Sequence, residues 1–74
     1  MDLFIEIHDR KTNEDLELNM VNITSYKSAT ITDLDGSSHI CIVYKTVFGL
    51  IYEEEFDNTS DRDAKLAILA DYLV

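Results

Sequence analysis

The sequence predicts a small α+β domain: an antiparallel sheet of about five strands, meander-like in order, with one C-terminal helix packed on one face. Three observations lead to this prediction. Apolar side chains alternate with polar ones through most of residues 2–56, which is the period of a strand. Two glycine-containing turn signals interrupt the strongest of these runs. After residue 58 the apolar period changes to that of a helix.

The first three strands follow from alternation and from the polar segments that separate them. Apolar residues alternate at about residues 2–8 and again at 16–20, and the polar segment 9–14 between them is typical of a turn. Residues 21–27 have no clean period and are rich in Asn, Ser and Thr. We therefore expect a connection there, with the third strand starting near Ser28.

The densest run of β-branched and aromatic residues, 38–56, predicts the fourth and fifth strands. Val47-Phe48-Gly49 lies between its two halves, and Gly49 suits the left-handed last position of a three-residue loop. This loop pairs Thr46 with Leu50, Tyr44 with Tyr52, Ile42 with Glu54 and Ile40 with Phe56. Glu54 is the one charged residue among these pairs, which are otherwise mostly apolar or aromatic.

Asp35-Gly36 is a strong signal for a two-residue hairpin turn between the third and fourth strands. Such a turn pairs Ile31 with Ile40 and Ala29 with Ile42 on the core face. Thr30 and Thr32 then face Cys41 and His39 on the other side of the sheet.

A helix is expected at about residues 61–73. Ser60 and Asp63 have the spacing of a capping box. Asp61 and Lys65 are four residues apart, in the favourable orientation for an ion pair. The apolar stripe comprises Leu66, Leu69, Ala70 and Leu73, widened by Ile68 and Tyr72.

Length and charge restrict the function more than any motif does. The chain has 74 residues, enough for one domain, and fifteen acidic residues against six basic ones give a net charge of −9. This charge argues against direct binding to nucleic acid or to anionic membranes and favours a basic protein partner. One cysteine cannot form an intramolecular disulfide, and the N-terminus lacks the features of a signal peptide. We expect a cytoplasmic protein, of a cell or of an infected host, without a membrane span.

Six acidic residues fall within residues 53–63 and form the first candidate site. Glu53 and Glu55 share one strand face, roughly 6.7 Å apart, close to the spacing of phosphates along one DNA strand. The alternative is a solvated rim that protects an edge strand. Phe48, in a tight turn, is a candidate contact anchor. The predicted partner-binding residues are Glu53, Glu55, Asp57, Asp61, Asp63 and Phe48.

Two other patterns carry less weight. The segment 33–37 resembles part of a calcium loop, but apolar residues stand where the oxygen ligands of an EF-hand belong. His39 and Cys41 share a strand face with Glu55, which offers a weak metal or thiol cluster. We interpret them as a small buried thiol beside a surface histidine. We expect no catalytic residues, no metal and no cofactor, and therefore no enzyme.

Two functions fit these features. The first is an acidic binding or inhibitory module that occupies a basic, nucleic-acid-binding partner, as phage-encoded antagonists and nucleic-acid mimics do. The second is a structural homodimer whose acidic surface serves solubility. Its interface would use the leftover apolar residues Phe4, Val43, Val47 and Ile51.

Overall fold

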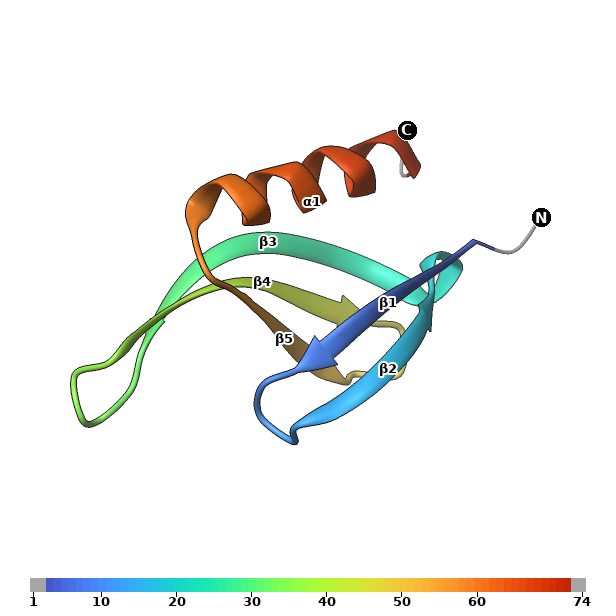
Figure 1. Cartoon of the computed structure of the whole chain (residues 1–74). Helices are drawn as coiled ribbons and strands as arrows, with labels where there is room; N and C mark the ends of the chain where they lie inside the picture. Colours follow the sequence, from blue (N-terminus) through green and yellow to red (C-terminus); the bar gives the residue numbers. More distant parts are fainter. Residues whose placement is uncertain (1–2, 73–74) are drawn as a thin grey trace.

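A computed structural model describes residues 3–72 as one five-stranded antiparallel sheet followed by a helix (Figure 1). This confirms the predicted α+β class and the position of the helix. The elements are β1 (Phe4–Asp9), β2 (Glu14–Asn19), the 3-10 turn η1 (Met20–Asn22), β3 (Ile23–Thr32), β4 (Ser38–Thr46), β5 (Ile51–Phe56) and α1 (Thr59–Tyr72).

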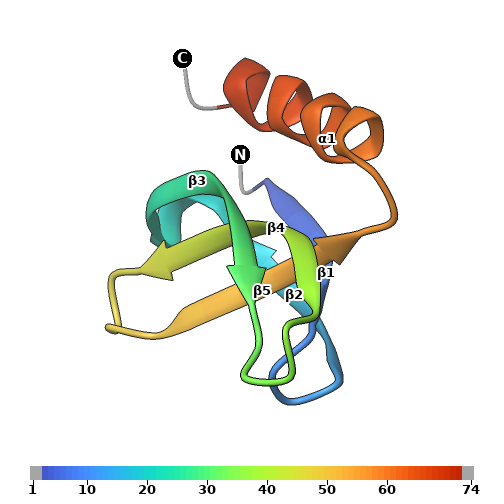
Figure 2. The same cartoon turned by 90° about the vertical axis from the view of Figure 1, so that its left-hand side faces the viewer.

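The strand order is β2-β1-β5-β4-β3. Strands β3, β4 and β5 form the expected meander, but β1 then pairs with β5, so β2 and β3 lie at the two edges although they are neighbours in sequence. The helix follows β5, contacts β4 and β5, and lies to one side of the sheet (Figure 2). The acidic strand β5 is therefore interior, and the interpretation of its carboxylates as protection for an edge strand is wrong.

A buried carboxylate joins β1 to β5. The two strands share one bridged pair, Asp9 with Glu54, beside a hydrogen bond of 2.9 Å from the Arg10 N–H to the Glu53 carbonyl. The Asp9 side chain, 1% exposed, accepts the Glu53 N–H at 3.0 Å and the Thr12 hydroxyl at 3.0 Å. Burial alone would raise the pKa of Asp9, but these hydrogen bonds outweigh it and lower the pKa. The Asp9 carboxylate thus accepts the Glu53 N–H at this junction, in place of a backbone carbonyl of a neighbouring strand.

The core lies between the sheet and α1. Alternate residues of β1 are buried, and Ile42, Tyr44 and Leu69 are fully buried beside them. The expected misfit at Glu54 is resolved inside this core: Glu54 accepts hydrogen bonds from the Tyr44 hydroxyl at 2.7 Å and from Lys65 Nζ at 3.1 Å. Burial first, and then Glu54, raise the pKa of Tyr44. The core cluster comprises Ile5, Ile7, Met20, Ile23, Ile42, Tyr44 and Leu69.

The β4–β5 hairpin has the predicted register. Ile40 pairs with Phe56, Ile42 with Glu54 and Tyr44 with Tyr52. The loop closes with a hydrogen bond from the Thr46 N–H to the Leu50 carbonyl at 3.0 Å, and Gly49 has φ +80°.

The predicted β3–β4 register is wrong by one residue. The Asp33 N–H donates to the Ser37 carbonyl at 2.8 Å, and Gly36 has φ +89°, so Gly36 ends a three-residue loop instead of completing a two-residue turn. A slip of one residue exchanges the faces of a strand. Ala29 and Ile31 therefore lie opposite Cys41 and His39, and Thr30 lies opposite Ile40.

Strand β3 also begins earlier than expected, at Ile23 instead of near Ser28. The turn η1 allows this early start. Asn19 caps it, accepting the Val21 N–H at 3.1 Å, while the Met20 N–H donates to the Leu3 carbonyl at 2.8 Å. The chain thus turns within three residues, and the polar segment that lacks a period continues into the long edge strand.

The helix begins two residues before the predicted start. Asn58 caps it by accepting the Asp61 N–H at 2.8 Å, and its amide reaches the Asp61 carboxylate at 3.4 Å, so the capping pair is not Ser60 with Asp63. Lys65 binds Glu54 and the Glu6 carbonyl instead of the expected Asp61. Of the predicted stripe, Leu69 is buried and Leu66 partly buried, Ile68, Ala70 and Tyr72 are exposed, and Leu73 lies outside the described residues.

Candidate functional site

The structure separates the predicted acidic cluster into internal and exposed carboxylates. Glu53 and Glu55 share the outer face of β5, as expected. Glu53 binds Arg10 Nη1 at 3.0 Å with its side chain 17% exposed, and Glu55 binds His39 Nδ1 at 2.5 Å. Much of the charge of this pair is therefore satisfied within the protein.

These two contacts belong to a network of five charged side chains across the outer face of the sheet: Arg10, Asp33, His39, Glu53 and Glu55. His39 Nε2 binds Asp33 at 2.6 Å, and Arg10 Nη2 binds the same carboxylate at 3.2 Å. This network links the β1–β2 turn, the β3–β4 loop and β5. Glu55 first, and then Asp33, raise the pKa of His39. The pKa of Arg10 is raised in the same way, first by Glu53.

Cys41 lies on this face between β3 and β5, opposite Ala29 and Glu55, as the β4–β5 register predicts for Glu55. Its side chain is buried, and burial raises the pKa of the thiol. Both ring nitrogens of His39 are engaged by carboxylates, so His39 has no spare nitrogen to deprotonate the thiol. Within residues 3–72, His, Cys, Asp and Glu side chains form no group of three suited to a metal ion.

The remaining predicted residues are exposed. Asp57 follows β5, Asp61 and Asp63 lie at the start of α1, and Asp63 accepts a hydrogen bond from the neighbouring Arg62 Nε at 3.3 Å. Phe48 is 71% exposed at the tip of the β4–β5 loop, which agrees with its expected position in a tight turn. The acidic residues and Phe48 therefore point to solvent from different elements.

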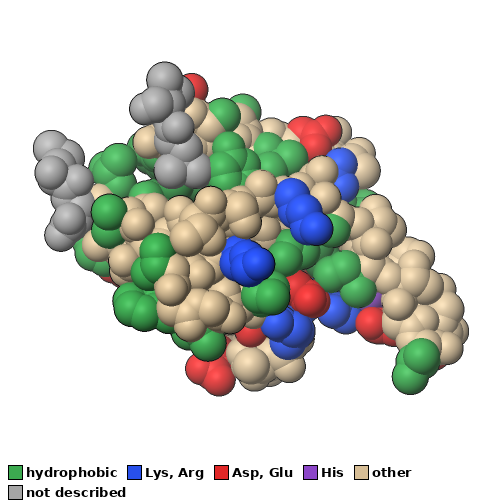
Figure 3. All heavy atoms as spheres, turned by 180° about the vertical axis from the view of Figure 1, so that it is seen from behind, with side chains coloured by type: hydrophobic (Ala, Val, Ile, Leu, Met, Phe, Trp, Pro, Cys, Tyr) green, Lys and Arg blue, Asp and Glu red, His purple; other side chains and the backbone are tan. Residues whose placement is uncertain are grey.

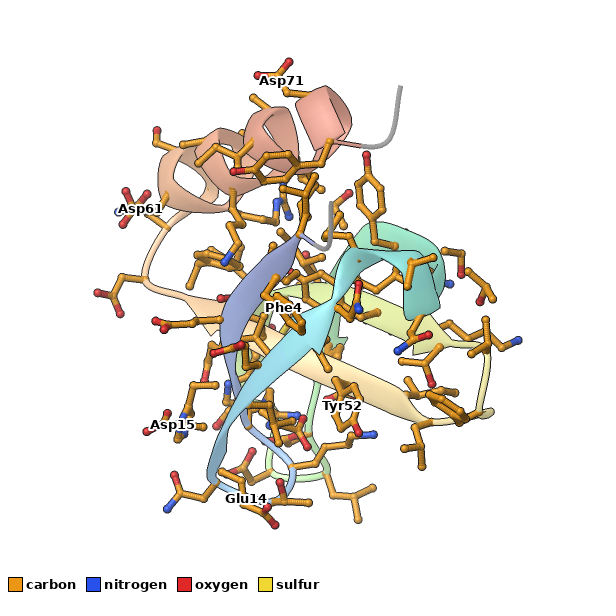
Figure 4. The ribbon with its side chains drawn as sticks, turned by 90° about the vertical axis from the view of Figure 1, so that its right-hand side faces the viewer. Phe4, Glu14, Asp15, Tyr52, Asp61 and Asp71 are labelled. Atoms are coloured by element: carbon orange, nitrogen blue, oxygen red, sulfur yellow. The ribbon has the colours of Figure 1, made fainter. Side chains whose placement is uncertain are left out.

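The β1–β2 hairpin carries an acidic surface that was not predicted. Glu6 of β1 lies directly opposite Glu17 of β2, and both are exposed. They line an acidic hollow of about 510 Å³ together with Asp15, Glu54 and His8. Figure 4 shows Asp61 and Asp15 on the same side of the molecule. Strand alternation places Glu6 and Glu17 on the polar faces of their strands. Together with a register for the first hairpin, taken from its polar turn, it would have indicated this surface.

One ammonium group contacts two of the residues that line this acidic hollow. Lys65 Nζ lies 3.1 Å from Glu54 Oε2 and 3.2 Å from the Glu6 carbonyl. In contrast, no ion pair among residues 3–72 involves the carboxylates of Glu6 and Glu17. The acidic hollow thus combines a satisfied wall with two unneutralised carboxylates.

The outer face of the sheet also carries basic side chains. Seen from behind, Lys and Arg side chains gather over the middle of the molecule, with apolar side chains between them (Figure 3). On this outer face Lys27 and Lys45 line a shallow depression with Val43 and Ile51, and Val43 lies opposite Glu53 of β5. Lys11 Nζ donates to the Ile51 carbonyl at 2.7 Å. Negative and positive charge are therefore unevenly distributed over the surface.

Comparisons with known proteins add no assignment: no family model, no curated protein and no solved structure matches the chain. No helix within residues 3–72 is long and apolar enough to cross a membrane.

Proposed function

We propose that this protein is a small cytoplasmic binding module that engages, and thereby inhibits, a basic nucleic-acid-binding protein through its carboxylates. It acts by binding and not by catalysis. The surface centres on the acidic hollow and extends to the carboxylates at the start of α1 (Asp57, Asp61 and Asp63), with Phe48 as an apolar contact. Glu53 and Glu55 contribute to the field of the protein while Arg10 and His39 hold them in place.

The observation that carries this proposal is the pairing of Glu6 with Glu17 across the exposed face of β1–β2. Like charges directly opposite each other destabilise a sheet. A basic side chain of a partner, inserted between them, removes that repulsion. The contact of Lys65 with Glu54, one of the residues that line the same hollow, supports an ammonium group as the kind of ligand.

The test is a pull-down with the tagged protein, eluted by increasing salt, using variants matched in charge. The variant Glu6→Gln/Glu17→Gln should lose a captured basic protein at much lower salt than the native chain, because long-range attraction depends on these charges. Asp35→Asn/Asp71→Asn removes the same charge from the β3–β4 loop and the end of α1 and serves as the control. Equal retention by both variants at low salt would refute the role of the acidic hollow.

A homodimer is the second candidate, favoured by apolar exposure on several elements. Phe4, Val47 and Ile51 are all exposed. Sedimentation at high micromolar concentration decides this alternative: a monomeric mass would exclude it. A dimer would remain compatible with the first function, since it doubles the acidic surface.

A further inference from the structure

An apolar groove runs beside the free edge of β2. It has a volume of about 460 Å³. Consecutive strand residues point to opposite faces, yet Glu17, Leu18 and Asn19 all line this groove. Phe4 of β1 lines it too, so the groove starts over the exposed face of β1–β2 and passes the edge of β2 that β1 does not occupy. On its far side lie Leu50, Tyr52 and Phe48.

The groove offers both backbone groups and apolar side chains. As an edge strand, β2 presents N–H and C=O groups that no strand of the described sheet pairs. In Figure 4, Tyr52 lies beyond β2 on the side away from β1. Phe48 and Leu50 are exposed by 71% and 51%, so the wall across from β2 is apolar and accessible. Large exposed apolar side chains clustered beside an unpaired strand edge are typical of peptide recognition by strand addition.

Charge selects the kind of peptide. The sequence of β2 carries Glu14, Asp15 and Glu17 and no basic residue. Asp15 and Glu17 also line the acidic hollow, so the groove and the hollow meet at β2. A bound strand therefore meets carboxylates on one face and Leu18, Leu50 and Tyr52 on the other.

We propose that β2 recruits an extended segment of its partner, in which Lys or Arg alternates with apolar residues, as an added strand. This inference rests on the proposed function and specifies its partner. The other edge strand, β3, has ten residues with Lys27 as its one charged residue, so it lacks the negative charge that would select a basic segment.

The test uses three labelled peptides of identical side-chain composition. The first alternates Lys and Val over seven residues, the second has the same order with every internal amide N-methylated, and the third places its Lys and Val residues in separate blocks. The first should bind about tenfold tighter than the others, because the second lacks the N–H donors of an added strand and the third cannot place Lys on one face and Val on the other. Amide exchange of residues 14–19 should slow in its complex alone.

Variants test the apolar wall. Phe48→Ala/Leu50→Ala should weaken binding of the alternating peptide about tenfold, through lost apolar contact. Leu34→Ala, which removes an even more exposed apolar residue from the β3–β4 loop, should change it less than twofold.

The outcomes separate the two proposals. Equal, salt-sensitive binding of all three peptides, lost in Glu6→Gln/Glu17→Gln, would overturn strand addition and leave the acidic recognition standing. Failure of all three to bind at low salt would overturn both.

Discussion

At the scale of single residues, Asp9 is the side chain whose loss should cost most among the polar groups. Asp9→Ala removes the acceptor of the Glu53 N–H and the Thr12 hydroxyl in a buried position. We expect a loss of about 1–3 kcal/mol in the free energy of unfolding, the usual cost of an orphaned buried group. Urea unfolding measures it, with the exposed Asp15→Ala as a control that should stay within about 0.5 kcal/mol. A similar small effect of both variants would contradict the bridging role.

The sign of the pH dependence of Asp9 follows from its lowered pKa. A carboxyl group with a depressed pKa in the folded state stabilises the protein above its unfolded pKa, and this contribution is lost as pH falls through the folded value. Asp9→Ala should therefore flatten the loss of stability in the acid range.

His39 predicts a pH dependence of the opposite sign. Its pKa is raised above the ordinary value of 6.5 by Glu55 and Asp33, so its stabilising contribution is complete below that value and is lost as pH rises through the folded pKa. His8, whose pKa is raised first by Asp15, titrates in the same direction. The difference between the urea midpoints at pH 5.5 and at pH 8.5 should be smaller in His39→Gln than in the native chain. His8→Gln is measured alongside. An unchanged difference in both variants would contradict this assignment.

At the scale of elements, the cap of α1 distinguishes the structure from the sequence pattern. Asn58→Ala removes the acceptor of the Asp61 N–H, and substitution of such a cap costs about 1 kcal/mol. Ser60→Ala, at the cap position that the sequence favours, should change stability by less than half of that amount. Thermal unfolding of the two variants compares them directly, and a larger effect at Ser60 would place the start of the helix where the sequence predicts it.

The hairpins show how much of the fold the sequence could predict. Gly49 and Gly36 end loops of the same kind, with positive φ and matching hydrogen bonds. The register around Gly49 was predictable because a two-residue turn at Phe48-Gly49 would place Tyr44 opposite Glu53, whereas the three-residue loop places it opposite Tyr52. Around Gly36, the apolar residues Ile31 and Ala29 indicated a strand face that is buried in the core, and this gave the wrong register. Apolar residues on an outer face alternate with polar ones in the same way, because β-branched residues are favoured on either face of a strand. Local turn signals alone could not distinguish the correct register from the one that is shifted by one residue.

The candidate site was less predictable than the fold, for a physical reason. Pairing of β1 with β5 is a long-range contact that no local pattern encodes, and it brings Arg10 to Glu53. The acidic run was therefore visible in the sequence, whereas the partners that neutralise it were not. The exposure of Phe48 was predictable because an aromatic side chain in the middle of a three-residue loop is hard to bury locally.

At the scale of the whole molecule, a net charge of −9 destabilises the compact state through self-repulsion, and Glu6 opposite Glu17 concentrates that effect. Glu17→Lys replaces this repulsion by an opposite-charge pair and should stabilise the protein by about 0.5–1 kcal/mol. The same change should abolish capture of a basic partner. Asp71→Lys alters the net charge equally at the exposed end of α1 and should leave capture nearly intact.

A gain in stability with a loss of binding would mean that the carboxylate pair is retained for recognition at the expense of stability, as is common at functional sites. The two measurements, urea unfolding and salt-dependent capture, must move in opposite directions for Glu17→Lys. If stability rises while capture stays at the level of Asp71→Lys, the pair serves only solubility, and the acidic hollow loses its assigned role.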